Sequence, residues 1–147
     1  ILAAVTRSML ITIISIIVFS LIIEIHIYNF FYIFIFAFLG SFILGALGFI
    51  TGLWAEKFDH MATVTNFIIT PLSFLSGVFY SVDRLPDFFK LISKINPFFY
   101  MIDGFRFGFL GTSDGLINNG IIYLTILSMV MWLISYYLYK VGYKIKS

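Results

Sequence analysis

The sequence predicts an all-α integral membrane protein, with four transmembrane helices and a re-entrant helical hairpin between the last two. Its 147 residues are 61% hydrophobic and only 11% charged, whereas soluble domains carry about 25% charged residues. Four long apolar runs each reach the roughly 20 residues that a helix needs to cross a bilayer. Backbone polar groups cannot stay unpaired in lipid, so we expect each run to be a helix. A β-barrel would need short segments of alternating hydrophobicity, which the sequence lacks.

The four predicted spans cover residues 2–23, 27–55, 61–82 and 116–139. Arg7 lies near the start of the first span, where its long side chain can reach the interface. The second span is long enough to tilt or to include an interfacial lead-in. Buried helices of a large soluble protein are the alternative, but the four runs occupy too much of the chain to favour it.

A stripe of small residues follows the second predicted span. Spacings of three and four place its members on one helical face, and they are Ala37, Ser41, Gly45, Gly48 and Gly52. Small residues let helix backbones approach closely, and close packing drives helix association in lipid. We expect this face to pack against a neighbouring span, and a contact between subunits is the alternative.

The third predicted span contains a proline near its middle. Pro71 removes one backbone hydrogen bond and clashes with the preceding turn, so we expect a kink near residues 67–71. Ser73, Ser76 and Gly77 follow. They either seal the break or line a polar path, and the sequence leaves both readings open.

Residues 83–111 connect the last two spans and are predicted to form two short helices. Asp83 is expected to cap the first helix, with Pro86 in its first turn. The segment 87–94 is amphipathic, with apolar side chains on one side and charges on the other, which suits a helix lying in the membrane interface.

The second short helix is predicted to begin at Asn96-Pro97, with Asn96 as the cap and Pro97 at the first helical position. Gly111 is expected to end this helix. Two short helices between spans favour a re-entrant hairpin. An amphipathic loop resting on the membrane surface is the alternative.

Two polar residues and two glycines characterise this second helix. Asp103 and Arg106 are three residues apart and can pair across one turn, which lowers the cost of charge at membrane depth. Gly104 and Gly108 repeat the spacing of four that allows close helix packing.

The chain has no P-loop, no HExxH zinc motif and no serine-centred nucleophile motif, so neither catalytic nor metal-binding residues are predicted. His26 and His60 flank different spans and are read as interfacial polar residues. Span interiors nearly free of charge disfavour ion coupling. Scattered basic residues give no indication of a nucleic-acid surface.

The distribution of basic residues bears on orientation. Four spans place both termini on one side of the membrane. The turn at residues 24–29 has no Lys or Arg, whereas three lysines follow the last span, which favours termini in the cytoplasm. These are Lys140, Lys144 and Lys146. Four basic residues in the 83–111 connection nearly balance the count.

A family resemblance rests on one ordered set of residues. The run from Pro71 to Ser81 reads PLSFLSGVFYS. It is followed by Leu85-Pro86, Asn96-Pro97, Tyr100-Met101-Ile102, Gly104-Phe105-Arg106 and Gly108-Phe109-Leu110-Gly111. In this order and spacing, the residues resemble the C-terminal signature of ABC-2 type transporter permeases, in particular bacterial inner-membrane exporters of drugs and polysaccharides.

The resemblance implies a six-helix exporter with both termini in the cytoplasm. Residues 1–147 would then be the C-terminal part of its transmembrane domain and supply the last four helices. The segment 83–111 would be an external re-entrant pair, acting as a lid with Phe79, Tyr80 and Tyr100 near the exit.

The same resemblance implies the function. The chain would belong to the permease subunit of an ATP-driven exporter that moves a drug, polysaccharide or lipid across the bacterial inner membrane. ATP and Mg²⁺ would bind a partner ATPase subunit, with no cofactor on this chain, and a second permease copy would complete the complex. An ATP-independent channel or transporter is the alternative, followed by an intramembrane enzyme.

Overall fold

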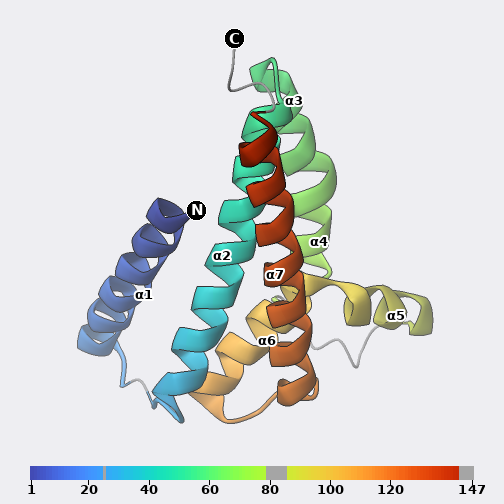
Figure 1. Cartoon of the computed structure of the whole chain (residues 1–147). Coiled ribbons are helices and arrows are strands. Elements are labelled where there is room, and N and C mark those ends of the chain that lie inside the picture. The colour runs from blue at the N-terminus through green and yellow to red at the C-terminus, as the bar shows by residue number, and fades with distance from the viewer. Residues whose placement is uncertain (25, 79–85, 143–147) are drawn as a thin grey trace.

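The computed structural model describes residues 1–24, 26–78 and 86–142, and over these ranges the chain is helical with short connections (Figure 1). The helices, in chain order, are α1 Leu2–Ile22, α2 Phe30–Trp54, α3 Phe58–Val64, the π-helical turn η1 Thr65–Ile69, α4 Thr70–Phe74, α5 Asp87–Ile95, α6 Pro97–Leu110 and α7 Ile117–Val141.

Three of these helices, α1, α2 and α7, are long and apolar enough to cross a membrane, judged over the described residues. They correspond to the first, second and fourth predicted spans. Figure 1 shows α2 and α7 rising side by side in the same direction, whereas α1 descends at one edge of the molecule. The all-helical class is confirmed, and the count of four spans is not.

The third predicted span, 61–82, differs from its prediction. Three pieces of 7, 5 and 5 residues follow one another as α3, η1 and α4, and the helix ends at Phe74. Gly77 then has a left-handed backbone with φ of 79°, which glycine adopts without steric cost. The helix is therefore shorter than the run of apolar residues, and positions 79–82 of that run lie outside the described residues.

The distortion expected near Pro71 takes the form of η1, a π-helical turn directly before α4. The Thr70 hydroxyl donates to the carbonyl of Thr65, five residues back, at 3.0 Å. Proline has no N–H to donate, and a π-turn is one of the ways in which a helix accommodates such a break.

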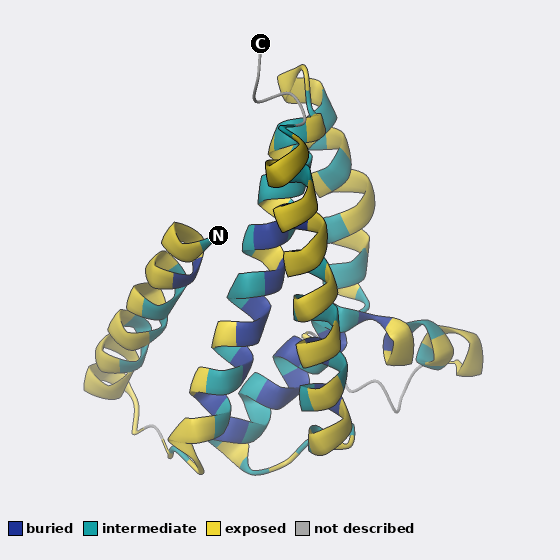
Figure 2. Cartoon of the chain, in the orientation of Figure 1, coloured by how far each residue is buried: buried dark blue, intermediate teal, exposed yellow. Residues whose placement is uncertain are grey.

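The core lies where α2, α6 and α7 meet, as the buried residues in Figure 2 show. Its members are Phe36, Leu39 and Ile43 of α2, Met101 of α6 and Leu124 of α7. By contrast, Val5 is the one buried hydrophobic residue of α1, whose described side chains are otherwise partly or largely exposed. Exposed apolar helix faces of this kind suit contact with lipid or with further protein.

Two glycines bring α6 directly against α2. A Cβ atom at Gly104 would lie 2.3 Å from the ring of Phe36, and one at Gly108 would lie 2.4 Å from the side chain of Ile33. The chain just before α2 also closes the end of α6, because Asn29 N–H donates to the Gly108 carbonyl at 2.9 Å. The close packing is therefore accompanied by hydrogen bonds between the same two elements.

The small-residue stripe of α2 divides into two parts. Gly45 faces α1, where an added Cβ would lie 2.9 Å from the Cβ of Ala4. Added Cβ atoms at Gly48 and Gly52 would meet no described atom within 4 Å. Within the described chain, internal packing therefore uses the Gly45 end of the stripe.

Replacing Gly104 by alanine should destabilise the protein, because the Phe36 ring is buried and has no free space to move into. We expect Gly104→Ala to lower the free energy of unfolding by about 1–3 kcal/mol, measured by equilibrium unfolding of the full-length protein in mixed detergent micelles. Gly48→Ala is the matched control and should leave stability unchanged or raise it by up to about 1 kcal/mol. Equal effects of the two substitutions would contradict the packing.

Candidate functional site

The candidate site is the junction between α5 and α6. Figure 1 shows α5 projecting sideways from the bundle, while α6 slopes beneath α2 and α7. α6 packs along both of those helices, whereas packing between α5 and α6 is confined to their junction. The two short helices therefore diverge over the described residues, and a re-entrant path through a membrane is not established.

Asn96 forms the junction. Its Oδ1 accepts a hydrogen bond from Phe98 N–H at 3.0 Å, and Pro97 takes the first position of α6. Its Nδ2 donates to the carbonyl of Leu72 in α4 at 2.6 Å. The residue is only 2% exposed, so one side chain caps α6 and also joins it to α4, as a buried polar group requires.

Three more side chains satisfy backbone carbonyls near the junction. The Ser93 hydroxyl donates to the Leu75 carbonyl at 3.0 Å, just after α4. The Tyr100 hydroxyl donates to the carbonyl of Lys94 at 2.8 Å, and the Tyr123 hydroxyl donates from α7 to the carbonyl of Ile95 at 2.7 Å. The last carbonyls of a helix lack intrahelical partners, and here α4 and α5 obtain them from neighbouring elements.

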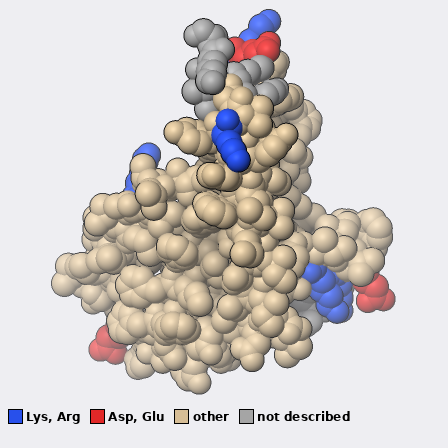
Figure 3. Space-filling model, in the orientation of Figure 1, with Lys and Arg blue, Asp and Glu red and all other residues tan. Residues whose placement is uncertain are grey.

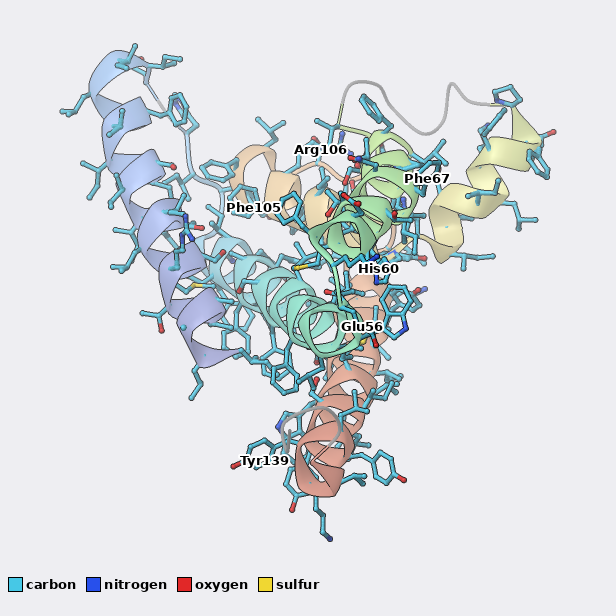
Figure 4. The ribbon with its side chains drawn as sticks, turned by 90° about the horizontal axis from the view of Figure 1, so that it is seen from above. Glu56, His60, Phe67, Phe105, Arg106 and Tyr139 are labelled. Atoms are coloured by element: carbon cyan, nitrogen blue, oxygen red, sulfur yellow. The ribbon has the colours of Figure 1, made fainter. Side chains whose placement is uncertain are left out.

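A second polar cluster fixes the other side of α6. Arg106, labelled in Figure 4, places Nη2 at 2.6 Å from Asp103 Oδ1 and at 2.9 Å from Asp114 Oδ2. Asp103 also accepts from the backbone N–H groups of Asp114 at 2.8 Å and of Gly115 at 3.0 Å. This cluster connects α6 to the loop that leads into α7.

Of the other predicted features of the connection, the start of the first short helix differs and the end of the second agrees with the prediction. The first short helix begins at Asp87, and Pro86 stands immediately before it instead of inside its first turn. Asp83, its predicted cap, lies outside the described residues, as do Phe79 and Tyr80. Gly111 ends α6 with a left-handed φ of 72°.

The serine next to the proline break has a local role. The Ser73 carbonyl accepts a hydrogen bond from the Ser76 hydroxyl, which helps to end the helix. Ser73 also lines a pocket of about 290 Å³ with Ile69, Thr70, Phe74 and Val78. No metal-type group of three or more His, Cys, Asp or Glu residues is found in the described ranges.

Sequence reasoning missed three residues of this site. Ser93, Asp114 and Tyr123 contact groups that lie 18, 11 and 28 residues away in sequence. Helical spacing cannot reveal such partners. Asp114, a carboxylate in a polar loop eight residues after Arg106, was the one available signal.

Comparison with known proteins identifies the family. The ABC-2 type transporter family matches residues 1–110. The chain belongs to this family. It is 39% identical to the inner membrane transport permease YadH of Escherichia coli K12 over 100 residues, which cover 68% of this chain and 39% of that permease.

A more distant relative is nodulation protein J of Rhizobium leguminosarum bv. viciae, with 35% identity over 66 residues. Those residues cover 45% of this chain and 26% of the relative. The matched regions thus span well under half the length of these relatives. No solved structure matches the chain. The matched range of the family includes α6 and both of its polar clusters, apart from Asp114, Gly115 and Tyr123.

Removing the Asn96 side chain should destabilise the junction, because it leaves the part-buried N–H of Phe98 and carbonyl of Leu72 without these partners. We expect Asn96→Ala to lower the free energy of unfolding by about 1–3 kcal/mol in mixed micelles. Asn118→Ala, at an exposed position in the first turn of α7, is the matched control and should cost less than about 0.5 kcal/mol. Similar losses of stability in both variants would contradict the role of Asn96 in joining α6 to α4.

Proposed function

We propose that this chain is part of the membrane-spanning subunit of an ATP-driven ABC exporter in a bacterial inner membrane. Membership of the ABC-2 transporter family is the observation that carries the proposal. Its relative YadH is an inner membrane transport permease by name, which supports the proposal. The sequence has no P-loop, so ATP and Mg²⁺ would bind a separate ATPase subunit.

In this proposal the α3–α4 segment also crosses the membrane, as the third of four spans in chain order. The α5–α6 segment re-enters the membrane from the outer side. The contact between Tyr123 and Ile95 supports this arrangement. Tyr123 lies six residues into α7, a rise of about 9 Å, so the junction is beside the body of α7 and not at its end. The satisfied carbonyls of α4 and α5 suit a low-polarity environment.

The proposed complex contains two permease copies and two ATPase subunits, with the chain termini in the cytoplasm. The substrate class is hydrophobic or lipid-linked: a drug, a polysaccharide or a lipid. The aromatic side chains around α6 suit such cargo, among them Phe99, Tyr100, Phe105 and Phe107.

Transport requires two states with different substrate affinity, and ATP binding on the partner would shift their populations. The α5–α6 unit would act as the lid, with α6 as its fixed part and α5 as its moving part. The Asp103–Arg106–Asp114 cluster would keep α6 fixed to α7 in both states, while α5, which packs on the bundle only at the junction, would change position.

The experiment that tests this proposal is purification of the full-length protein from native membranes in a mild non-ionic detergent. We expect an ATPase subunit with a P-loop to co-purify. The complex should hydrolyse ATP, and export in the source cells should stop when ATP is depleted. The control is a matched preparation from cells that carry the permease without the affinity tag used for purification. Transport that persists without ATP, with no ATPase bound, would favour an ATP-independent channel or transporter and overturn the proposal.

A further inference from the structure

A pocket of about 600 Å³ that combines charged and apolar side chains lies between α5, α6 and the start of α7. Lys90 and Lys94 of α5 form one wall, and Asp114 and Asn119 contribute from the loop before α7 and from α7 itself. Tyr100 adds its ring, while its hydroxyl is already bound to the Lys94 carbonyl. The pocket therefore adjoins the junction, and the ammonium groups of its two lysines take no part in the hydrogen bonds described there.

The two lysines are four residues apart, so they lie on one face of α5. Among the described residues, neither ammonium group forms an ion pair. The carboxylate of Asp114 is directed to Arg106, whose Nη2 lies 2.9 Å away. The charged side chains that line the pocket are therefore two lysines and one carboxylate, and that carboxylate is already paired with Arg106. This lining favours an anion.

The opposite side of α5 is apolar and exposed. Phe88, Leu91 and Ile95 are 69%, 62% and 66% exposed. On the face drawn in Figure 3, a broad uncharged surface covers the middle of the molecule, and charged side chains reappear beside α5. A helix with this division of side chains lies at the boundary between acyl chains and headgroups, which is the level at which lipid phosphates occur.

We propose that this pocket binds the phosphate of an anionic membrane lipid headgroup. The ammonium groups of Lys90 and Lys94 would hold the phosphate, and the side-chain amide of Asn119 would donate a hydrogen bond. The apolar side of α5 would lie among the acyl chains of the same lipid. The site adds a lipid ligand to the chain and does not depend on ATP-driven export.

The test uses the full-length protein purified in a non-ionic detergent and titrated with dihexanoyl phosphatidylglycerol, with binding read by native mass spectrometry. We expect saturable binding at one site. Lys90→Gln and Lys94→Gln should each weaken it about fivefold, in keeping with the contribution of one lysine near an anionic lipid. The double variant should weaken it further. Asn119→Ala should also weaken binding, and Asn118→Ala should not.

Two arms identify the source of the phosphate. Dihexanoyl phosphatidylcholine should bind more weakly than phosphatidylglycerol, and inorganic phosphate should bind more weakly still, since neither combines a net negative headgroup with acyl chains. Inorganic phosphate binding as tightly as the lipid would overturn the assignment to a lipid.

Lys140→Gln is the control for loss of one positive charge, because Lys140 lies in the last turn of α7 and does not line this pocket. Unfolding midpoints of all variants should match the parent protein. Binding that is unchanged in the Lys90→Gln/Lys94→Gln protein would overturn the site. Gain or loss of lipid binding would not alter the co-purification of an ATPase. Failure of this inference is therefore distinct from failure of the proposed function.

Discussion

The buried carboxylate of Asp103 is the interaction on which the arrangement of the second half of the chain depends. Asp103 is only 3% exposed, and a carboxylate in that position is costly unless it is paired and hydrogen-bonded. Its partners are Arg106 and the N–H groups of Asp114 and Gly115. All of them lie on α6 or on the loop before α7, so α6, the loop and the start of α7 are held as one unit.

That unit is fixed against α2 by close contact and not by charge. Gly104 and Gly108 leave room for Phe36 and Ile33, while the N–H groups of Tyr28 and Asn29 reach the last carbonyls of α6. At the other end of α6, the side chain of Asn96 donates a hydrogen bond to the Leu72 carbonyl of α4. The end carbonyls of these short helices thus have hydrogen-bond partners without water. Pairing of every backbone polar group is the main constraint on chains in lipid.

Local signals made much of this predictable from the sequence. The Asn96-Pro97 start, the Gly111 end and the Asp103–Arg106 spacing each involve neighbours within one turn of helix. The third span was predicted to run to residue 82, whereas the helix ends at Phe74. Hydropathy continues through residues that the backbone uses for a turn at Gly77. Asp114, Ser93 and Tyr123 could not be found, because their partners are set by how the helices pack.

The most direct test of the account is a double-mutant cycle on Asp103 and Arg106, with free energies of unfolding measured in mixed micelles. If the carboxylate and guanidinium form one buried unit, Asp103→Ala and Arg106→Ala should each be costly, and the double variant should lose much less than the two losses combined. We predict a coupling of about 1–3 kcal/mol. Additive losses, with coupling near zero, would contradict the claim that Asp103 and Arg106 act as one unit.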